Sequence, residues 1–293
     1  MTGAQGEGGD ERPRIPWGVW IALLLGALLA AAISTRTARA GAWTQEKGAL
    51  YNRLAGSFYG STEEYDTEGH RDFIPFHGDY AEVNLTDYVE YGLTDRLTVL
   101  GSLVLKKLEL ENDIRITRSK GLGDIDAALR FKLAEGSAGV ASVQALVKIP
   151  TGYEVDVPLP IGNGEFEYDA HLLYGRSLWP LIPGYCGVEV GYRWRAGAPE
   201  DEIRYLAEVG TDLGKHLYTR AKLDGVKGTK SGAAVDLNGN PTIRNAYDLG
   251  TLDLTFGGKL GSHWFLEGGY APSLYGRTTT AGSRWSLALA CTL

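Results

Sequence analysis

The chain has 293 residues, 44% of them hydrophobic and 22% charged, with a formal net charge of −7. The acidic balance disfavours nucleic acid as a partner, and the apolar content is too high for a disordered chain. After position 40 the sequence holds no long apolar run, which excludes a membrane-spanning helix there. Its 40 glycines and 16 tyrosines suit a sheet protein with tight turns and interfacial aromatic side chains.

The N-terminal residues have the pattern of an export signal. An apolar run from Trp17 to Ile33 follows basic residues and precedes Ala38-Arg39-Ala40, a small-x-small pattern that signal peptidase recognises. We predict a signal peptide over residues 1–40, with cleavage after Ala40, and a barrel domain over residues 41–293. The alternative is an uncleaved anchor, because the run approaches the roughly 18 residues that span a bilayer. Both interpretations export the remaining chain.

The main pattern in the remaining chain is an alternation of polar and apolar residues. In DIDAALRFKL (residues 124–133) every second residue, starting with Asp124, is mostly charged, and the residues between them are apolar throughout. We call each such set of alternate residues a parity, because the two sets face opposite sides of a β-strand. The same alternation recurs in residues 185–195, 202–213, 248–260 and 284–293. Segments of about ten residues with this period are what a tilted β-strand needs to cross a bilayer.

The linkers between these segments alternate in length, which favours a membrane barrel over a soluble sandwich, whose strands also alternate. The short linkers are Leu93–Asp95, Ala134–Ala138, Pro180–Gly184, Gly214–His216 and Gly261–Ser262. The linkers between them, most of them longer, are Ser61–Gly78, Glu111–Lys120, Gly152–Gly164, Ala196–Asp201, Lys227–Tyr247 and Gly276–Gly282. Short periplasmic turns and long outer loops are typical of bacterial outer-membrane barrels. We therefore predict an all-β antiparallel transmembrane barrel with both termini periplasmic. It has about twelve strands, with about ten to fourteen also compatible, and its first strand lies near Lys47–Gly60.

The polar parity of these strands lines the lumen of such a barrel. The lumen-lining candidates are Arg53, Glu82, Glu90, Arg96, Asp124, Asp126, Arg130, Lys132, Glu167, Asp169, His171, Glu189, Arg193, Arg204, Glu208, Arg220, Lys222, Asp253, Lys259, Glu267 and Arg284. A barrel of about twelve strands is narrow, since aqueous channels are typical of about sixteen strands or more. The charges then form either a salt-bridged, hydrated plug or a translocation path with ion-pair constrictions.

The cysteines and tryptophans lie near expected strand ends. Cys186 and Cys291 belong to the apolar parity of strands that lie across the barrel from each other. A disulfide needs Cα atoms within about 7 Å, so we predict two free thiols. An aromatic girdle at the membrane interfaces is the interpretation for five tryptophans, Trp43, Trp179, Trp194, Trp264 and Trp285.

Motifs for catalysis or metal binding are weak. Some small outer-membrane barrels hydrolyse lipid with a serine and a histidine, but none of the 5 histidines here lies in an H-x-S arrangement. His70 and His77 lie in an acidic stretch whose oxygens suit a cation, but a solvated acidic loop is the favoured interpretation of that stretch. The sequence has no Cys/His metal spacing, Gly-rich phosphate loop or nucleophile elbow. We predict no catalytic residue, no cofactor and no bound metal.

Several short motifs follow one another in an order that characterises a known family. They are AWTQ (residues 42–45), GSFY (56–59), GLGDI (121–125), KIPTG (148–152), GNG (162–164), LLYGRS (172–177) and VGYR (190–193). In these motifs, over most of Gly41 to Leu293, the chain resembles the outer-membrane barrels of the MetA-pathway of phenol degradation family. The resemblance implies a transporter-like barrel that passes small hydrophobic or aromatic molecules. Such barrels usually end on an aromatic residue, and this chain ends on Leu293, which keeps the apolar parity. We therefore expect the barrel-assembly machinery to insert it.

Three functional hypotheses follow from these patterns. The first is an outer-membrane channel or transporter for a small-molecule cargo, surrounded by outer-membrane lipid. The second is a closed structural or partner-binding barrel that acts through its outer loops, and the third is a lipid-modifying enzyme. The Lys227–Tyr247 loop is long enough to fold inward as a constriction or outward as a lid.

Overall fold

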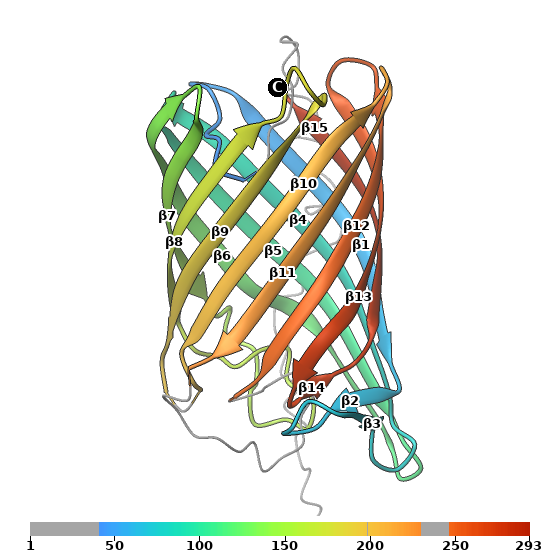
Figure 1. Cartoon of the computed structure of the whole chain (residues 1–293). Coiled ribbons are helices and arrows are strands. Elements are labelled where there is room, and N and C mark those ends of the chain that lie inside the picture. The colour runs from blue at the N-terminus through green and yellow to red at the C-terminus, as the bar shows by residue number, and fades with distance from the viewer. Residues whose placement is uncertain (1–40, 198, 230–245) are drawn as a thin grey trace, which may run out of the picture.

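A computed structural model describes residues 41–197, 199–229 and 246–293. The expected signal peptide (residues 1–40) and most of the Lys227–Tyr247 loop lie outside the described residues. Twelve long strands close into a single antiparallel barrel, and three short strands form a small separate sheet (Figure 1). Among the described residues, no helix is long and apolar enough to cross a membrane.

The barrel strands follow one another around the wall in chain order. They are β1 (Leu50–Ser61), β4 (Asp79–Thr94), β5 (Leu97–Glu111), β6 (Ile116–Gly136), β7 (Gly139–Ile149), β8 (Glu167–Ser177), β9 (Gly184–Arg195), β10 (Glu202–Leu213), β11 (Leu217–Gly228), β12 (Asp248–Leu260), β13 (Trp264–Arg277) and β15 (Ser283–Thr292). The short strands are β2 (Glu63–Tyr65), β3 (Arg71–Phe73) and β14 (Thr279–Thr280). Strand β1 pairs with both β4 and β15, which closes the ring. The predicted fold class and strand number are therefore confirmed.

The two ends of the barrel differ in their connections. The short turns after β4, β6, β8, β10 and β12 lie at the end where the C-terminus is marked, the upper end in Figure 1. The backbone N–H of Leu50 donates to the carbonyl of Leu293 at 2.9 Å, so β1 begins at this same end. The small sheet and the longer loops lie at the opposite end. We call these the short-turn end and the long-loop end.

The outer face of the barrel wall is apolar over most of its height. Leu172, Phe256 and Leu287 are 60%, 64% and 62% exposed, and they lie on three different strands of the ring. The exposed apolar side chains include Val83, Leu105, Leu129, Val188, Val190, Val209, Leu254 and Leu266. A water-soluble monomer rarely exposes a contiguous apolar patch above a few hundred Å². A ring of such residues around a closed barrel is the outer surface of a transmembrane β-barrel.

The apolar outer face ends before the strands do. At the long-loop end of β5 and β6, Arg118 pairs across the outer face with Glu109 at 2.8 Å, whereas Leu108 on the opposite parity is 1% exposed. The alternation therefore inverts where the wall leaves the apolar zone and its outer face meets water. The inward-facing Leu108 packs with Ile74, Tyr80 and Leu159 in a small core inside the mouth of the barrel.

The first residues of the described chain correct the expected start of the barrel. Strand β1 begins at Leu50 rather than near Lys47, and residues 41–49 turn into the lumen at the short-turn end. We call residues 41–49 the inner N-terminal segment. Trp43 is 7% exposed and packs with Ala42, Val140 and Leu173. The girdle interpretation of Trp43 is therefore wrong, because this indole has an apolar contact surface available inside the barrel.

The other four tryptophans lie near strand ends or in the turn after β8. Trp179, Trp194 and Trp285 are 71%, 49% and 60% exposed. The aromatic girdle stays a prediction for these four residues. Trp264 begins β13 and is half-buried. Both cysteines are free thiols in the structure.

Candidate channel lumen

The lumen near the long-loop end is filled by a network of charged side chains around Glu167 on β8. Its carboxylate contacts Lys148 at 2.9 Å, Arg193 at 2.8 Å and Arg195 at 3.1 Å. The Glu167 side chain is 2% exposed. Three cations around one buried carboxylate satisfy its charge and its hydrogen-bond acceptors, which is the condition for a stable buried ion pair.

A second carboxylate on β8 extends this network toward the middle of the barrel. Asp169 accepts a hydrogen bond from Arg193 Nε at 2.7 Å and lies 3.2 Å from His171 Nε2. The other ring nitrogen of His171 lies 2.6 Å from Glu189 Oε1 on β9. His171 therefore bridges two carboxylates of neighbouring strands.

A loop from the long-loop end also enters the lumen beside this network. Residues 150–166 connect β7 to β8, and Leu159 within them is fully buried. The Tyr153 hydroxyl donates to Asp124 at 2.5 Å, and Lys106 Nζ donates to the Ile161 carbonyl at 3.2 Å. We call residues 150–166 the inward loop. Its contacts with the inner wall narrow the lumen at this end.

Toward the short-turn end, the lumen opens into a cavity of about 640 Å³. Its wall is formed mainly by β9 to β13, β1 and β4, and one edge is formed by Gly41 and Gln45 of the inner N-terminal segment. The charged lining residues are Arg53, Glu90, Arg130, Glu189, Glu208, Asp212, Arg220, Lys222, Asp253, Lys259 and Glu267. The aromatic lining residues are Tyr51, Tyr88, Tyr185, Tyr218 and Phe265. The cavity therefore offers charges of both signs beside aromatic rings.

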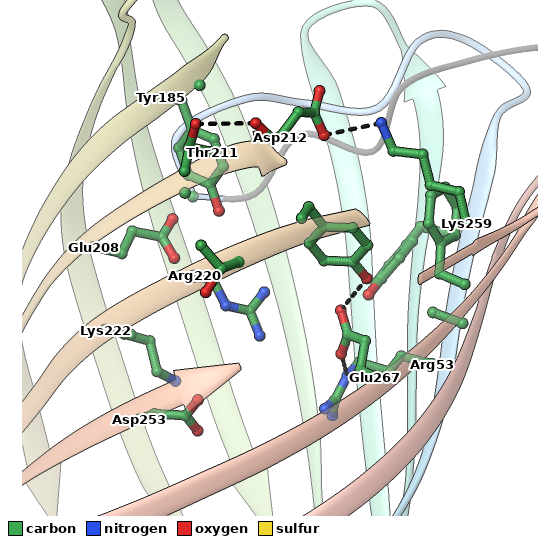
Figure 2. A pocket seen from close by; sticks show the side chains of 18 of the residues that line it. Arg53, Tyr185, Glu208, Thr211, Asp212, Arg220, Lys222, Asp253, Lys259 and Glu267 are labelled. Atoms are coloured by element: carbon green, nitrogen blue, oxygen red, sulfur yellow. Dashed lines mark hydrogen bonds and ion pairs between the residues drawn. The ribbon is translucent and has the colours of Figure 1, made fainter. Parts of the chain in front are cut away.

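Several charges of the cavity form pairs with each other (Figure 2). Arg53 Nε donates to Glu267 at 2.7 Å, and Lys259 Nζ donates to Asp212 at 2.9 Å. The Tyr218 hydroxyl donates to the second oxygen of Glu267 at 2.8 Å. Each of these pairs joins two strands that are separated by one strand in the ring, and they fix the side chains against the wall.

Two charged groups of the cavity are poorly satisfied. Arg220 on β11 donates from Nη2 to Thr255 Oγ1 at 3.4 Å, and its Nε has no hydrogen-bond partner among the described residues. Glu208 on β10 is 8% exposed, and its Oε1 likewise lacks a partner within the described part of the chain. Figure 2 shows both side chains pointing into the cavity from neighbouring strands. An unsatisfied charge at a cavity wall favours any ligand that supplies the missing contact.

The inner N-terminal segment is bound to the inner wall at the short-turn end. Arg130 donates to the Trp43 carbonyl at 3.2 Å, and Ser142 Oγ donates to the Ala42 carbonyl at 2.5 Å. Gln45 Nε2 donates to Glu90 Oε2 at 2.7 Å. Each of these wall residues belongs to the inward parity of its strand, so the segment is held by the same polar residues that line the lumen.

Gly92 on β4 permits the C-terminal part of the inner N-terminal segment to approach the barrel wall closely. The Gly48 amide donates to the Gly92 carbonyl on β4 at 2.8 Å, and a Cβ on Gly92 would lie 2.0 Å from the Glu46 carbonyl oxygen. Any side chain at position 92 would therefore displace the segment.

Most of the residues expected from the sequence to line the lumen lie on the inward parity of the barrel strands. Ten of them line the cavity described above, and Asp124, Glu167, Asp169, His171, Arg193 and Arg204 surround the charged network. Glu82 accepts hydrogen bonds from Tyr80 and Asn84. Asp126 on β6 lies opposite Lys148 of β7, which belongs to the charged network around Glu167. Lys132 pairs with Glu135 near the short-turn rim.

Two other residues that were expected to line the lumen lie away from both the charged network and the cavity. Arg96 is exposed in the turn between β4 and β5, so it lies at the rim and not on the wall. Arg284 is exposed near the long-loop end of β15.

Sequence reasoning did not identify the inner N-terminal segment or the inward loop. The signal that could have found them is the weak alternation of β7, where Val140 faces inward and packs with Trp43. Among the described residues, no cluster of His, Cys, Asp and Glu has the geometry of a metal site.

A closed barrel with an apolar outer face and a charged interior defines the class of transmembrane β-barrel proteins. In fold the chain is similar to an outer-membrane channel from Pseudomonas putida F1, with a TM-score of 0.68 and 15% sequence identity. That match covers 88% of this chain and 100% of the other. A more distant likeness is to the translocator domain of the autotransporter NalP from Neisseria meningitidis, with a TM-score of 0.48 and 12% identity over 94% and 96% of the two chains. No family model and no curated protein matches the sequence.

Proposed function

We propose that the chain is an outer-membrane channel for small molecules that carry polar or charged groups, small aromatic molecules among them. The observation that carries this proposal is the cavity of about 640 Å³ inside the barrel, with its charged and tyrosine-rich lining. Ligand cavities in proteins commonly have about 300–1,000 Å³, so one small molecule fits here. The fold shared with the Pseudomonas putida outer-membrane channel is consistent with this proposal.

The lining narrows the class of cargo. A purely hydrophobic molecule would displace water from eleven charged side chains without replacing their hydrogen bonds, which is unfavourable. A molecule with an aromatic ring and a charged or hydroxylated substituent can contact both kinds of lining residue, for example Tyr185 and Arg220. The family resemblance implies hydrophobic or aromatic cargo, and the charged lining favours its polar aromatic members.

Orientation in the membrane follows from the expected export signal and from the two ends of the barrel. Short turns face the periplasm in bacterial outer-membrane barrels and long loops face outward. On this basis both ends of the mature chain are periplasmic, and the inner N-terminal segment closes the periplasmic mouth. Cargo would enter past the inward loop, occupy the cavity, and leave when the inner N-terminal segment moves.

Ion selectivity of single channels in a planar bilayer tests this function. The protein is purified from the outer membrane of an expressing Gram-negative host, and the reversal potential is measured in a KCl gradient. The Arg220→Gln variant removes a poorly satisfied cation from the cavity wall, so the reversal potential should shift toward cation selectivity. The matched control is Arg118→Gln, which removes an arginine from the outer face, where it is 60% exposed. This control should behave as the wild type.

The closed, partner-binding barrel is the second candidate, and the inner N-terminal segment is the observation that favours it. A folded wild type that passes no current, together with variants of this segment that also pass none, would support the closed barrel and contradict the channel. Equal reversal potentials for the wild type and Arg220→Gln would show that the cavity is not on the ion path.

A further inference from the structure

The carboxylate of Glu208 has no cationic partner in the part of the chain that the structure describes, although cations surround it. Its cross-strand neighbour Lys222 lies 3.3 Å from Asp224 instead. The nearby Arg220 donates to Thr255 at 3.4 Å. The Glu208 side chain is 8% exposed, and its Oε1 is buried without a hydrogen-bond partner within the described residues. An ionised carboxylate in this position is stabilised by a positively charged or hydrogen-bond-donating partner.

Gly41 lies next to this oxygen. A Cβ built on Gly41 would lie 2.9 Å from Glu208 Oε1, so the α-carbon of residue 41 sits directly beside the carboxylate. The position of Gly41 is fixed by the next residues, since Ser142 donates to the Ala42 carbonyl and Arg130 to the Trp43 carbonyl. The α-nitrogen of Gly41 is bonded to the same α-carbon and therefore lies within a short reach of Glu208.

The sequence places the expected signal-peptide cleavage site at this residue. Ala38-Arg39-Ala40 precedes Gly41, and cleavage after Ala40 makes Gly41 the first residue of the mature chain. In that cleavage, water adds across the Ala40–Gly41 peptide bond. Ala40 gains a carboxylate, and Gly41 gains a free α-amino group that takes up a proton at neutral pH, since such groups have pKa values of about 7.7–8.0 in model peptides.

We propose that signal peptidase cleaves after Ala40 and that the new α-ammonium group of Gly41 binds Glu208 inside the barrel. The processed N-terminus is then the missing cationic partner of this carboxylate, and the ion pair holds the inner N-terminal segment in the periplasmic mouth. An uncleaved chain has a neutral amide at the same nitrogen and cannot form the pair. Cleavage occurs during export, before the barrel closes around residue 41.

Glycine at position 41 fits this arrangement. It has a φ of +77°, and any side chain would press on Glu208 Oε1. A residue with a Cβ would therefore push the α-ammonium group away from the carboxylate that it binds. Gly48, the other glycine of the inner N-terminal segment, also has a positive φ of +81°, but a Cβ there would meet nothing within 4 Å.

The first test is the identity of the mature N-terminus. Full-length protein is expressed in a Gram-negative host, extracted from the outer membrane in its heat-modifiable folded form, and analysed by intact mass and N-terminal sequencing. The expected first residue is Gly41. A mature chain that begins at any other residue overturns the proposal.

The second test measures how fast an amine-reactive reagent labels the α-amine of Gly41, read from the N-terminal peptide by mass spectrometry. In the folded wild type the α-amine should react at least tenfold more slowly than in heat-unfolded protein. Glu208→Gln should remove most of this protection. Glu189→Gln, which neutralises another carboxylate of the same cavity, should react as the wild type. Equal protection in the wild type and Glu208→Gln contradicts the ion pair.

A second variant decides the question if Glu208→Gln fails to fold. One glycine inserted between Ala40 and Gly41 leaves Glu208 and the barrel sequence intact but moves the α-ammonium group by one residue. Its α-amine should be labelled as fast as in unfolded protein, and retained protection would overturn the proposal. Neither test uses conductance, so an electrically silent barrel would refute the channel function without affecting this ion pair.

Discussion

Replacing Trp43 with alanine should open the short-turn end of the barrel. The indole is 7% exposed, packs with Ala42, Val140 and Leu173, and meets the Tyr185 ring edge-on at 5.8 Å. Trp→Ala substitutions at buried sites cost about 3–5 kcal/mol. Here the lost contacts stabilise the docked inner N-terminal segment and not the barrel wall. Because each 1.4 kcal/mol is about a tenfold change, the undocked population should rise roughly a hundred- to several-thousand-fold.

The assay is open probability in single-channel recordings, with heat-modifiable gel mobility as the check that the barrel is folded. Trp285→Ala is the matched control, because Trp285 is 60% exposed on the outer face and lies against Tyr270 with the two ring planes tilted by 40°. The control should alter anchoring in the bilayer and leave open probability unchanged. A folded Trp43→Ala variant with the open probability of the wild type would refute the idea that this segment blocks the path.

Two further predictions concern glycine packing and an outer hairpin. A Cβ on Gly175 would lie 2.5 Å from the Trp43 ring, so Gly175→Ala should raise open probability in the same recordings, whereas Gly268→Ala, with nothing within 4 Å, should not. Equal effects of the two substitutions would contradict this packing argument. Asp66, between β2 and β3, has a lowered pKa because the backbone amides of His70 and Glu68 donate hydrogen bonds to its carboxylate. Its stabilising effect is therefore present above the ordinary carboxyl pKa of 3.8 and is lost as the pH falls through the lowered value. Hydrogen-exchange protection of those two amides should fall only in that acidic range. Asp66→Asn should remove this pH dependence, and an unchanged pH profile would count against it.

The alternation of residues was sufficient to predict the barrel because it is a local property of each strand. In residues 124–133 the charged parity faces the lumen and Ile125, Leu129 and Phe131 face outward, exposed by 36%, 51% and 43%. A strand with water on one side and lipid on the other has only one favourable orientation. Turns such as Gly214–His216 could also be predicted from the sequence, because a short polar linker between two such strands permits only a tight turn.

The alternation of polar and apolar residues did not predict the inward faces of the strands where segments of the chain, and not water, fill the lumen. Val140 and Leu173 face inward and Leu108 faces inward at the other end, each contrary to a simple polar interior. These residues contact Trp43 or Leu159, which arrive from segments outside the barrel strands. The irregular alternation in the sequence indicates that some apolar side chains face inward. A local pattern cannot predict which distant segment packs against them.

The sequence by itself therefore determined the strands, their inward faces and the asymmetry of the two ends, because each depends on neighbours along the chain and on the solvent at each face. Only the tertiary structure decided which charges pair, where the cavity lies and what closes it. Glu167 can meet Lys148, Arg193 and Arg195 only after three strands have taken their register. Gly41 reaches Glu208 only when the ring has closed around the inner N-terminal segment. Contacts between residues so far apart in the chain depend on the closed geometry, which local sequence patterns do not encode.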